Sequence, residues 1–145
     1  MNASLGGILL PLHAYAIANW SIDLKVPLMC LPVMLLCFNN LLAVTWPDRR
    51  ADAQAGKRTL ATRWRTESLR RLHAIVGILS FLTLITMAGW MIPLKVVGAS
   101  LLSAPLMFWG SREYTRVTVA LGSIYAMVTM FLAQSVAWFA IGLWV

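Results

Sequence analysis

The sequence predicts an all-α protein, a polytopic membrane helical bundle of about five transmembrane helices, and three observations support this. Of its 145 residues, 60% are apolar and 12% are charged, and the mean hydropathy is +0.76. Soluble domains carry about 25% charged residues. The apolar residues also gather in runs of about 20, the length that crosses a bilayer as a helix. Five such runs leave room for short connections and one longer loop, so we expect a single transmembrane domain over residues 1–145.

The elements follow from these runs in chain order. The longer polar loop, about 47–72, separates the second run from the third, and its last residues, Thr66–Leu72, have the pattern of a short amphipathic helix that Thr66 could cap. Tryptophans near the run ends are typical of an interfacial aromatic belt. The predicted spans are about Leu5–Trp20, Val26–Trp46, His73–Met91, Leu94–Gly110 and Val117–Trp138.

The basic residues are distributed very unevenly. Eight of the 12 lie in the 47–72 loop and two more lie in the Ser111–Arg116 link. Short basic loops between apolar spans face the cytoplasm. We therefore expect an integral protein of a bacterial inner or plasma membrane, with the N-terminus and the 47–72 loop in the cytoplasm and the C-terminus outside. The same distribution argues against a nucleic-acid partner.

Two carboxylates in the loop are candidates for metal binding. Asp48 and Asp52 are four residues apart, which on a helix places them on one face with Cβ atoms about 6 Å apart. A hard cation such as Mg²⁺ would relieve their repulsion, and it takes one or two carboxylates together with phosphate oxygens and water. The neighbouring basic residues, among them Arg49, Lys57 and Arg58, suit a diphosphate. The alternative interpretation is a set of solvated ion pairs of little energetic value.

The whole segment is more specific than the pair. Pro47-Asp48, Asp52 and the run Gly56-Lys57-Arg58-Thr59-Leu60 match, in order and spacing, a known motif. The segment resembles the second aspartate-rich motif of the UbiA-type intramembrane prenyltransferases. Two predicted spans precede it and three follow, so the resemblance is to the C-terminal half of a family member, helices five to nine of about nine.

The resemblance implies a transferase that joins a prenyl group from a prenyl diphosphate to a lipophilic, often aromatic, acceptor with the help of Mg²⁺. It makes Asp48 and Asp52 the catalytic, metal-holding residues, and Lys57 and Arg58, with Arg49 beside them, diphosphate contacts. The family carries a second aspartate motif in its other half, and this sequence has no further acidic pair. We therefore expect the chain to be inactive alone and to need a partner chain or self-association that supplies that motif.

Two polar side chains inside the predicted spans are further candidates. Tyr15 lies in the first span and Gln134 in the fifth, and intramembrane polar groups are often functional because an unpaired one is costly. Both could face an acceptor cavity, or they could form interhelical hydrogen bonds. A non-catalytic membrane protein or assembly partner derived from the same family is the alternative function.

Overall fold

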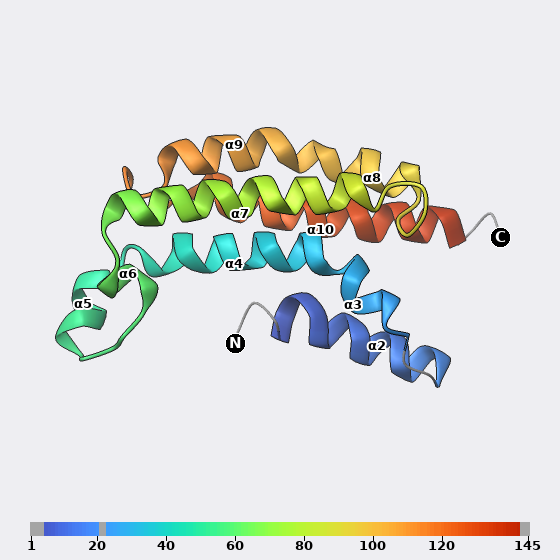
Figure 1. The fold of residues 1–145 in the computed structure, drawn as a ribbon, viewed down its shortest axis with the longest axis horizontal. Helices are drawn as coiled ribbons and strands as arrows, with labels where there is room; N and C mark the ends of the chain where they lie inside the picture. The colour runs from blue at the N-terminus through green and yellow to red at the C-terminus, as the bar shows by residue number, and fades with distance from the viewer. Residues whose placement is uncertain (1–4, 21–22, 143–145) are drawn as a thin grey trace.

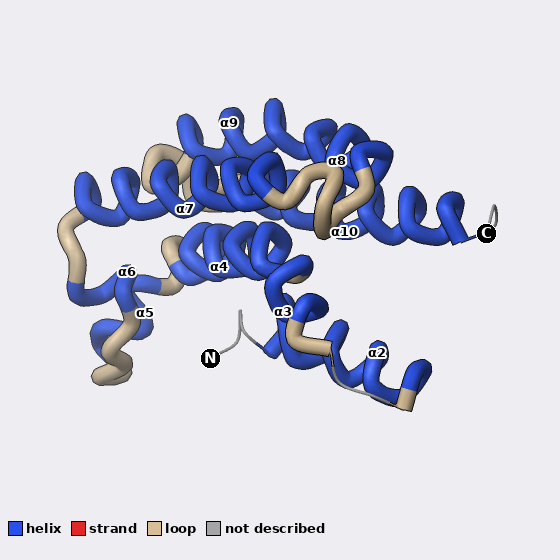
Figure 2. The backbone as a smooth tube through the Cα atoms, turned by 45° about the vertical axis from the view of Figure 1, so that its right-hand side comes forward, coloured by secondary structure: helices blue, strands red, loops and turns tan. Residues whose placement is uncertain are grey.

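The computed structural model describes residues 5–20 and 23–142, and helices with short connections make up this part of the chain (Figures 1 and 2). The all-α prediction is confirmed. The helices are η1 (Leu5–Leu9, a π-helix), α2 (Leu10–Asn19), α3 (Lys25–Met29), α4 (Leu31–Thr45), α5 (Arg49–Gln54), α6 (Leu60–Arg63), α7 (Thr66–Thr86), α8 (Leu94–Ser100), η2 (Leu101–Ser103, a 3₁₀-helix), α9 (Ala104–Glu113) and α10 (Leu121–Gly142).

Three helical segments in the described residues are long and apolar enough to cross a membrane: α7, α10 and the rod of α8, η2 and α9, which runs over Leu94–Glu113. They lie side by side with α4 in one bundle (Figure 1). Many of their large apolar side chains are exposed, including Ile78 on α7 and Phe139 on α10. Such an apolar outer surface belongs in lipid, so the prediction of a membrane helical bundle is confirmed.

The first two predicted spans are helical but interrupted. The first is a π-helical turn followed by α2, and the second breaks at Cys30 into α3 and α4. Pro11 and Pro32 sit in the first turns of α2 and α4. A proline has no amide hydrogen and tolerates the first helical turn but not the interior. The prolines therefore explain why these two segments consist of shorter helices than the runs of apolar residues predict.

Two polar side chains join α4 to α7. Nδ2 of Asn39 donates a hydrogen bond of 2.9 Å to the carbonyl oxygen of His73, and Oγ of Ser80 donates one of 2.7 Å to the carbonyl oxygen of Pro32. All four residues are buried. Interhelical bonds of this kind hold helices together in lipid, where apolar contact alone gives little preference.

The helices α9 and α10 touch through glycine. A Cβ placed on Gly110 would lie 2.4 Å from the amide nitrogen of Ser123, and a Cβ on Gly122 would lie 2.4 Å from the amide nitrogen of Gly110. The two backbones are thus closer than any larger residue permits, as is common between membrane helices.

The basic segments lie at the same end of the bundle. α5 and α6 project from that end, and residues 114–120, which connect α9 to α10, turn there as well (Figure 1). The predicted helix Thr66–Leu72 is present as the first two turns of α7, and Leu69 within it is fully buried. Thr66 does not cap it, because Arg65 occupies the N-cap position with extended backbone.

Candidate functional site

The Asp48–Asp52 pair sits on α5. Asp48 occupies the N-cap position and Asp52 lies in the first turn. The amide of Asp52 donates a 2.8 Å hydrogen bond to the carbonyl oxygen of Asp48, so the two residues are one helical turn apart. Asp48 is exposed and Asp52 is partly buried. The helical spacing that the sequence predicts for these carboxylates is confirmed.

Lys57 lies against this pair. Its Nζ is 2.8 Å from Oδ1 of Asp52, which is the one ion pair within the described residues. The hydrogen bond to Asp52 and the negative charge of that carboxylate raise the pKa of Lys57 above its usual value. A cation that binds Asp52 must therefore share the carboxylate with the ammonium group or displace it.

The glycine of the motif forms the turn after α5. Gly56 has a φ of +71°, in the left-handed region that glycine tolerates. Its amide donates to the carbonyl oxygen of Ala53, and the amide of Lys57 donates to the carbonyl oxygen of Asp52, at 3.1 and 2.9 Å. These two bonds form a Schellman motif, which satisfies the last carbonyl groups of α5. Both the backbone turn and the attraction between the two charged groups therefore place Lys57 beside Asp52.

The threonine of the motif begins the next helix. Thr59 caps α6, because its Oγ1 accepts a hydrogen bond from the amide of Thr62 while Oγ1 of Thr62 accepts one from the amide of Thr59. This reciprocal capping box is a local, sequence-encoded start signal. Arg58 lies exposed between the two turns. The motif thus forms two short helices whose adjoining ends are capped within the motif, and it presents Asp48, Asp52, Lys57 and Arg58 at one end of the bundle.

A basic cleft of about 330 Å³ lies beside this segment, where the end of α4 meets residues 115–118 of the α9–α10 connection. Arg49 and Arg50 line it from α5, and Arg116 lines it from the connection. Asp48 and Asp52 are not among its lining residues. The structure therefore places Arg49 in a basic cleft, whereas Lys57 contacts the carboxylate pair.

Arg49 is held by a column of aromatic rings. Its guanidinium carbon lies 3.7 Å from the ring centroid of Trp46. Trp46 meets Tyr114 edge to face at 6.0 Å, and Tyr114 stacks on His73 at 4.4 Å. Each contact is of a kind that stabilises aromatic and cationic groups. The column leads from the buried centre of the bundle, where Nε2 of His73 is 2.9 Å from Oγ of Ser123, to the cleft.

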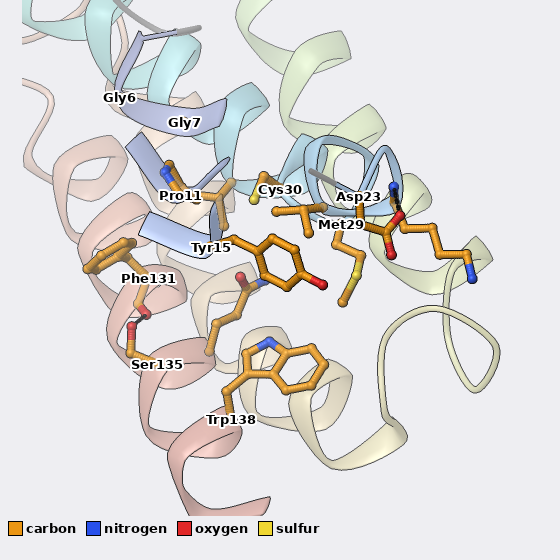
Figure 3. Close-up of a pocket in the computed structure, with 14 residues that line it drawn as sticks. Gly6, Gly7, Pro11, Tyr15, Asp23, Met29, Cys30, Phe131, Ser135 and Trp138 are labelled. Carbon is orange, nitrogen blue, oxygen red and sulfur yellow. Dashed lines mark hydrogen bonds between the residues drawn. The ribbon is translucent and has the colours of Figure 1, made fainter. Parts of the chain in front are cut away.

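Tyr15 and Gln134 line a different cavity. It has a volume of about 500 Å³, lies between α2, α3 and α10, and is mainly apolar. Tyr15 and Trp138 point into it in Figure 3. Nε2 of Gln134 is buried and has no hydrogen-bond partner in the part of the chain that the structure describes. Tyr15 and Gln134 thus line one cavity. Of the helices around it, α2 and α3 lie at the end of the bundle away from α5 (Figure 1).

Several residues of the site were not found by sequence reasoning. Tyr114 and His73 gave no local signal, since their contact joins helices far apart in the chain. Trp46 and Trp138, which the sequence assigns to an aromatic belt, support Arg49 and line the larger cavity. For Arg116 the basic link between two spans was the available signal.

The structure is an all-α bundle with an apolar outer surface and a segment of acidic and basic residues at one end. These features define a class, the polytopic membrane proteins. Comparison with protein families places the chain more narrowly: it matches the UbiA prenyltransferase family over residues 2–121. The chain therefore belongs to the UbiA prenyltransferase family. The matched range includes the Asp48–Asp52 segment and ends at the start of α10. Comparisons with curated proteins and with solved structures give no match.

Proposed function

We propose that this chain is one half of a membrane prenyltransferase, which transfers a prenyl group from a prenyl diphosphate to a lipophilic, often aromatic, acceptor. The observation that carries the proposal is the one-turn spacing of Asp48 and Asp52 on α5 in a chain of this family. In the reaction the C–O bond of the prenyl diphosphate breaks and diphosphate leaves with the electron pair. The acceptor forms the new bond to carbon and releases a proton.

The donor set fits Mg²⁺. Asp48 and Asp52 offer two hard carboxylate ligands one turn apart, the number of carboxylates that Mg²⁺ commonly takes. No cluster of three or more histidine, cysteine or acidic side chains occurs among residues 5–20 and 23–142, so water and diphosphate oxygens would fill the remaining positions. When bound, Mg²⁺ would neutralise negative charge on the diphosphate.

The other residues have distinct proposed roles. Lys57, now paired with Asp52, is within reach of a ligand on the carboxylate pair and would donate hydrogen bonds to a diphosphate oxygen. Arg58 would add a bidentate contact. Arg49, which the resemblance also assigns to the diphosphate, lines the basic cleft instead. Tyr15 and Gln134 would contact the apolar part of a substrate in the larger cavity, whose lining is mainly apolar and offers few polar groups.

The proposal includes a second acidic motif. With two carboxylates on α5 and no metal-binding cluster in the described residues, α5 would supply half of a diphosphate-holding site. We propose that a partner chain or a second copy supplies the other half, and that the isolated chain does not turn over. We also propose that the end carrying α5 faces the cytoplasm of a bacterium, since both basic segments lie there.

The test is Mg²⁺-dependent binding of geranyl diphosphate to the purified full chain in nanodiscs, measured by calorimetry. We expect binding with Mg²⁺ that is reduced at least about tenfold by Asp48→Asn or Asp52→Asn, since each removes a charged ligand. Glu67→Gln is the matched control, because Glu67 is an exposed acidic residue in the first turn of α7. Equal binding by all four proteins would overturn the assignment of Asp48 and Asp52.

The alternative, a non-catalytic membrane protein of the same family, has two observations in its favour. Lys57 already compensates the charge of Asp52, and the turn between α5 and α6 is held by backbone bonds and a capping box without a metal. On this alternative, Asp52→Asn lowers stability and leaves geranyl diphosphate binding unchanged.

A further inference from the structure

The basic cleft is chemically distinct from the carboxylate pair. Arg49 and Arg50 reach it from α5, and by the 100° advance per residue Arg50 lies about half a turn around the helix from Asp48. Arg116 lines the cleft from the α9–α10 connection. The lining also includes the threonines Thr115 and Thr118 and no acidic residue. The cleft is therefore lined by three arginines and two threonines.

The three arginines have no acidic partner. Within the described residues the ion pair is that of Lys57 with Asp52, so none of the three has a carboxylate within 4 Å. Glu113, the acidic residue nearest to Arg116 in the chain, does not line the cleft and forms no ion pair with it. Three arginines that line one cleft carry like charges, and an anion bound there would offset their repulsion.

The cleft is also preorganised. The guanidinium carbon of Arg49 lies 3.7 Å from the ring centroid of Trp46, which belongs to the aromatic column that ends at His73. On the other side, Oγ1 of Thr115 accepts a hydrogen bond from Nε of Arg70, which leaves the hydroxyl hydrogen of Thr115 free to donate. The backbone of Thr115 has a φ of +65°, a conformation that a non-glycine residue adopts when its surroundings fix it. Both walls are thus held by contacts to the bundle.

The cleft has the chemistry of a phosphate site. Guanidinium groups bind phosphate oxygens in bidentate fashion, and a threonine hydroxyl adds a neutral donor. Its place at the ends of α4, α9 and α10, beside the apolar surface of the bundle, puts it at the level of lipid headgroups when the helices span a membrane. We propose that Arg49, Arg50 and Arg116 bind a phosphate monoester or diphosphate group in this cleft without a metal, at a site separate from Asp48 and Asp52.

Two sources could supply this group, and the test distinguishes them. The full chain in phosphatidylcholine nanodiscs is titrated with pyrophosphate at low ionic strength in EDTA, which removes any contribution of Mg²⁺ at the carboxylate pair. In parallel, native mass spectrometry compares retention of phosphatidic acid and phosphatidylcholine. Pyrophosphate binding indicates a soluble ligand, and preferential retention of phosphatidic acid indicates a lipid headgroup.

The variants are Arg116→Gln, Arg116→Lys and Arg112→Gln. We expect Arg116→Gln to weaken whichever ligand binds by about tenfold, since a charge-assisted hydrogen bond is lost. Arg116→Lys should recover part of this affinity, because it keeps the charge but not the bidentate geometry. Arg112→Gln is the matched control: it removes a nearby positive charge that stacks over Phe108 outside the cleft.

Two results would overturn the proposal. One is the absence of binding by either ligand to the unaltered chain. The other is an equal loss of affinity in Arg116→Gln and Arg112→Gln, which would indicate attraction by net charge alone. Since EDTA is present throughout, neither result bears on the Mg²⁺-dependent binding at Asp48 and Asp52.

Discussion

The imidazole ring of His73 stacks on the phenol ring of Tyr114, with ring centroids 4.4 Å apart and planes inclined by 19°. Both side chains are fully buried, and they join α7 to the end of α9. The hydroxyl group of Tyr114 is buried as well, and the described residues offer it no hydrogen-bond partner. The ring of Tyr114, rather than its hydroxyl group, therefore makes the contact that supports Trp46 and Arg49.

This arrangement predicts opposite results for two substitutions. Tyr114→Phe should leave the free energy of unfolding unchanged or raise it, because it removes an unsatisfied buried hydroxyl group and keeps the ring. Tyr114→Ala should lower it by about 3 to 5 kcal/mol, since it leaves a cavity in the core. Denaturant unfolding in detergent micelles measures both. Equal losses in the two variants would mean that the hydroxyl group has a stabilising partner after all.

Tyr114 also predicts a dependence of stability on alkaline pH. Burial raises its pKa to about 12, and the positive charge of Arg49 opposes part of that shift. The unfolded chain titrates near pH 10, so the folded state favours the neutral phenol. The stability from this group is fully present below about pH 10 and is lost as the pH rises towards 12.

The measurement is the unfolding midpoint of the unaltered chain between pH 9 and 12, with Tyr114→Phe as the reference. The variant has every other titrating group of the chain and lacks this one. We expect the difference between the two proteins to change in favour of Tyr114→Phe as the pH rises. A difference that stays constant over this range would contradict the burial of the phenol.

Replacing Lys57 should have opposite effects on the affinity for a metal ion and on the affinity for a prenyl diphosphate. Its ammonium group occupies Oδ1 of Asp52, so Lys57→Gln frees that carboxylate and should strengthen the binding of Mn²⁺, used as a probe for Mg²⁺, by a few-fold. The same variant should weaken geranyl diphosphate binding, since it removes a charged donor. Paramagnetic resonance of Mn²⁺ and calorimetry give the two affinities. Arg58→Gln, an equal change in charge next to it, should leave Mn²⁺ binding nearly unchanged.

The glycine contact between α9 and α10 predicts a steric effect. Gly110→Ala or Gly122→Ala places a methyl group 2.4 Å from backbone nitrogen of the other helix, and we expect a loss of about 1 to 3 kcal/mol as the helices separate. Gly98→Ala on α8 is the matched control, because a Cβ there meets nothing within 4 Å. Thermal unfolding in micelles ranks the three, and comparable stability of all three would show that α9 and α10 do not touch.

The sequence predicts the helices and the acidic pair because both depend on local patterns. Runs of about 20 apolar residues indicate α7 and α10, and a four-residue spacing makes Asp48 and Asp52 neighbours on any helix. The breaks just before Pro11 and Pro32 reflect the amide hydrogen that each proline lacks, which hydropathy does not register.

The rest of the site depends on packing between distant segments. The stack of Tyr114 on His73 joins two distant segments, and Arg116 lines the same basic cleft as Arg49. Tyr15 and Gln134 line one cavity, but nothing in their spacing indicates that it lies away from α5. No local period encodes such distances.

The two hydrogen bonds between α4 and α7 have a further consequence. Pro32 and Asn39 are seven residues apart on α4, and His73 and Ser80 are seven apart on α7, so both bonds fit a single antiparallel alignment. Apolar helices in lipid can slide past each other at little cost, but a shift of one turn here would break both bonds together. Together the two hydrogen bonds fix the position of α4 along α7. Since α5 follows α4, the same alignment also sets the depth of Asp48 relative to the membrane surface.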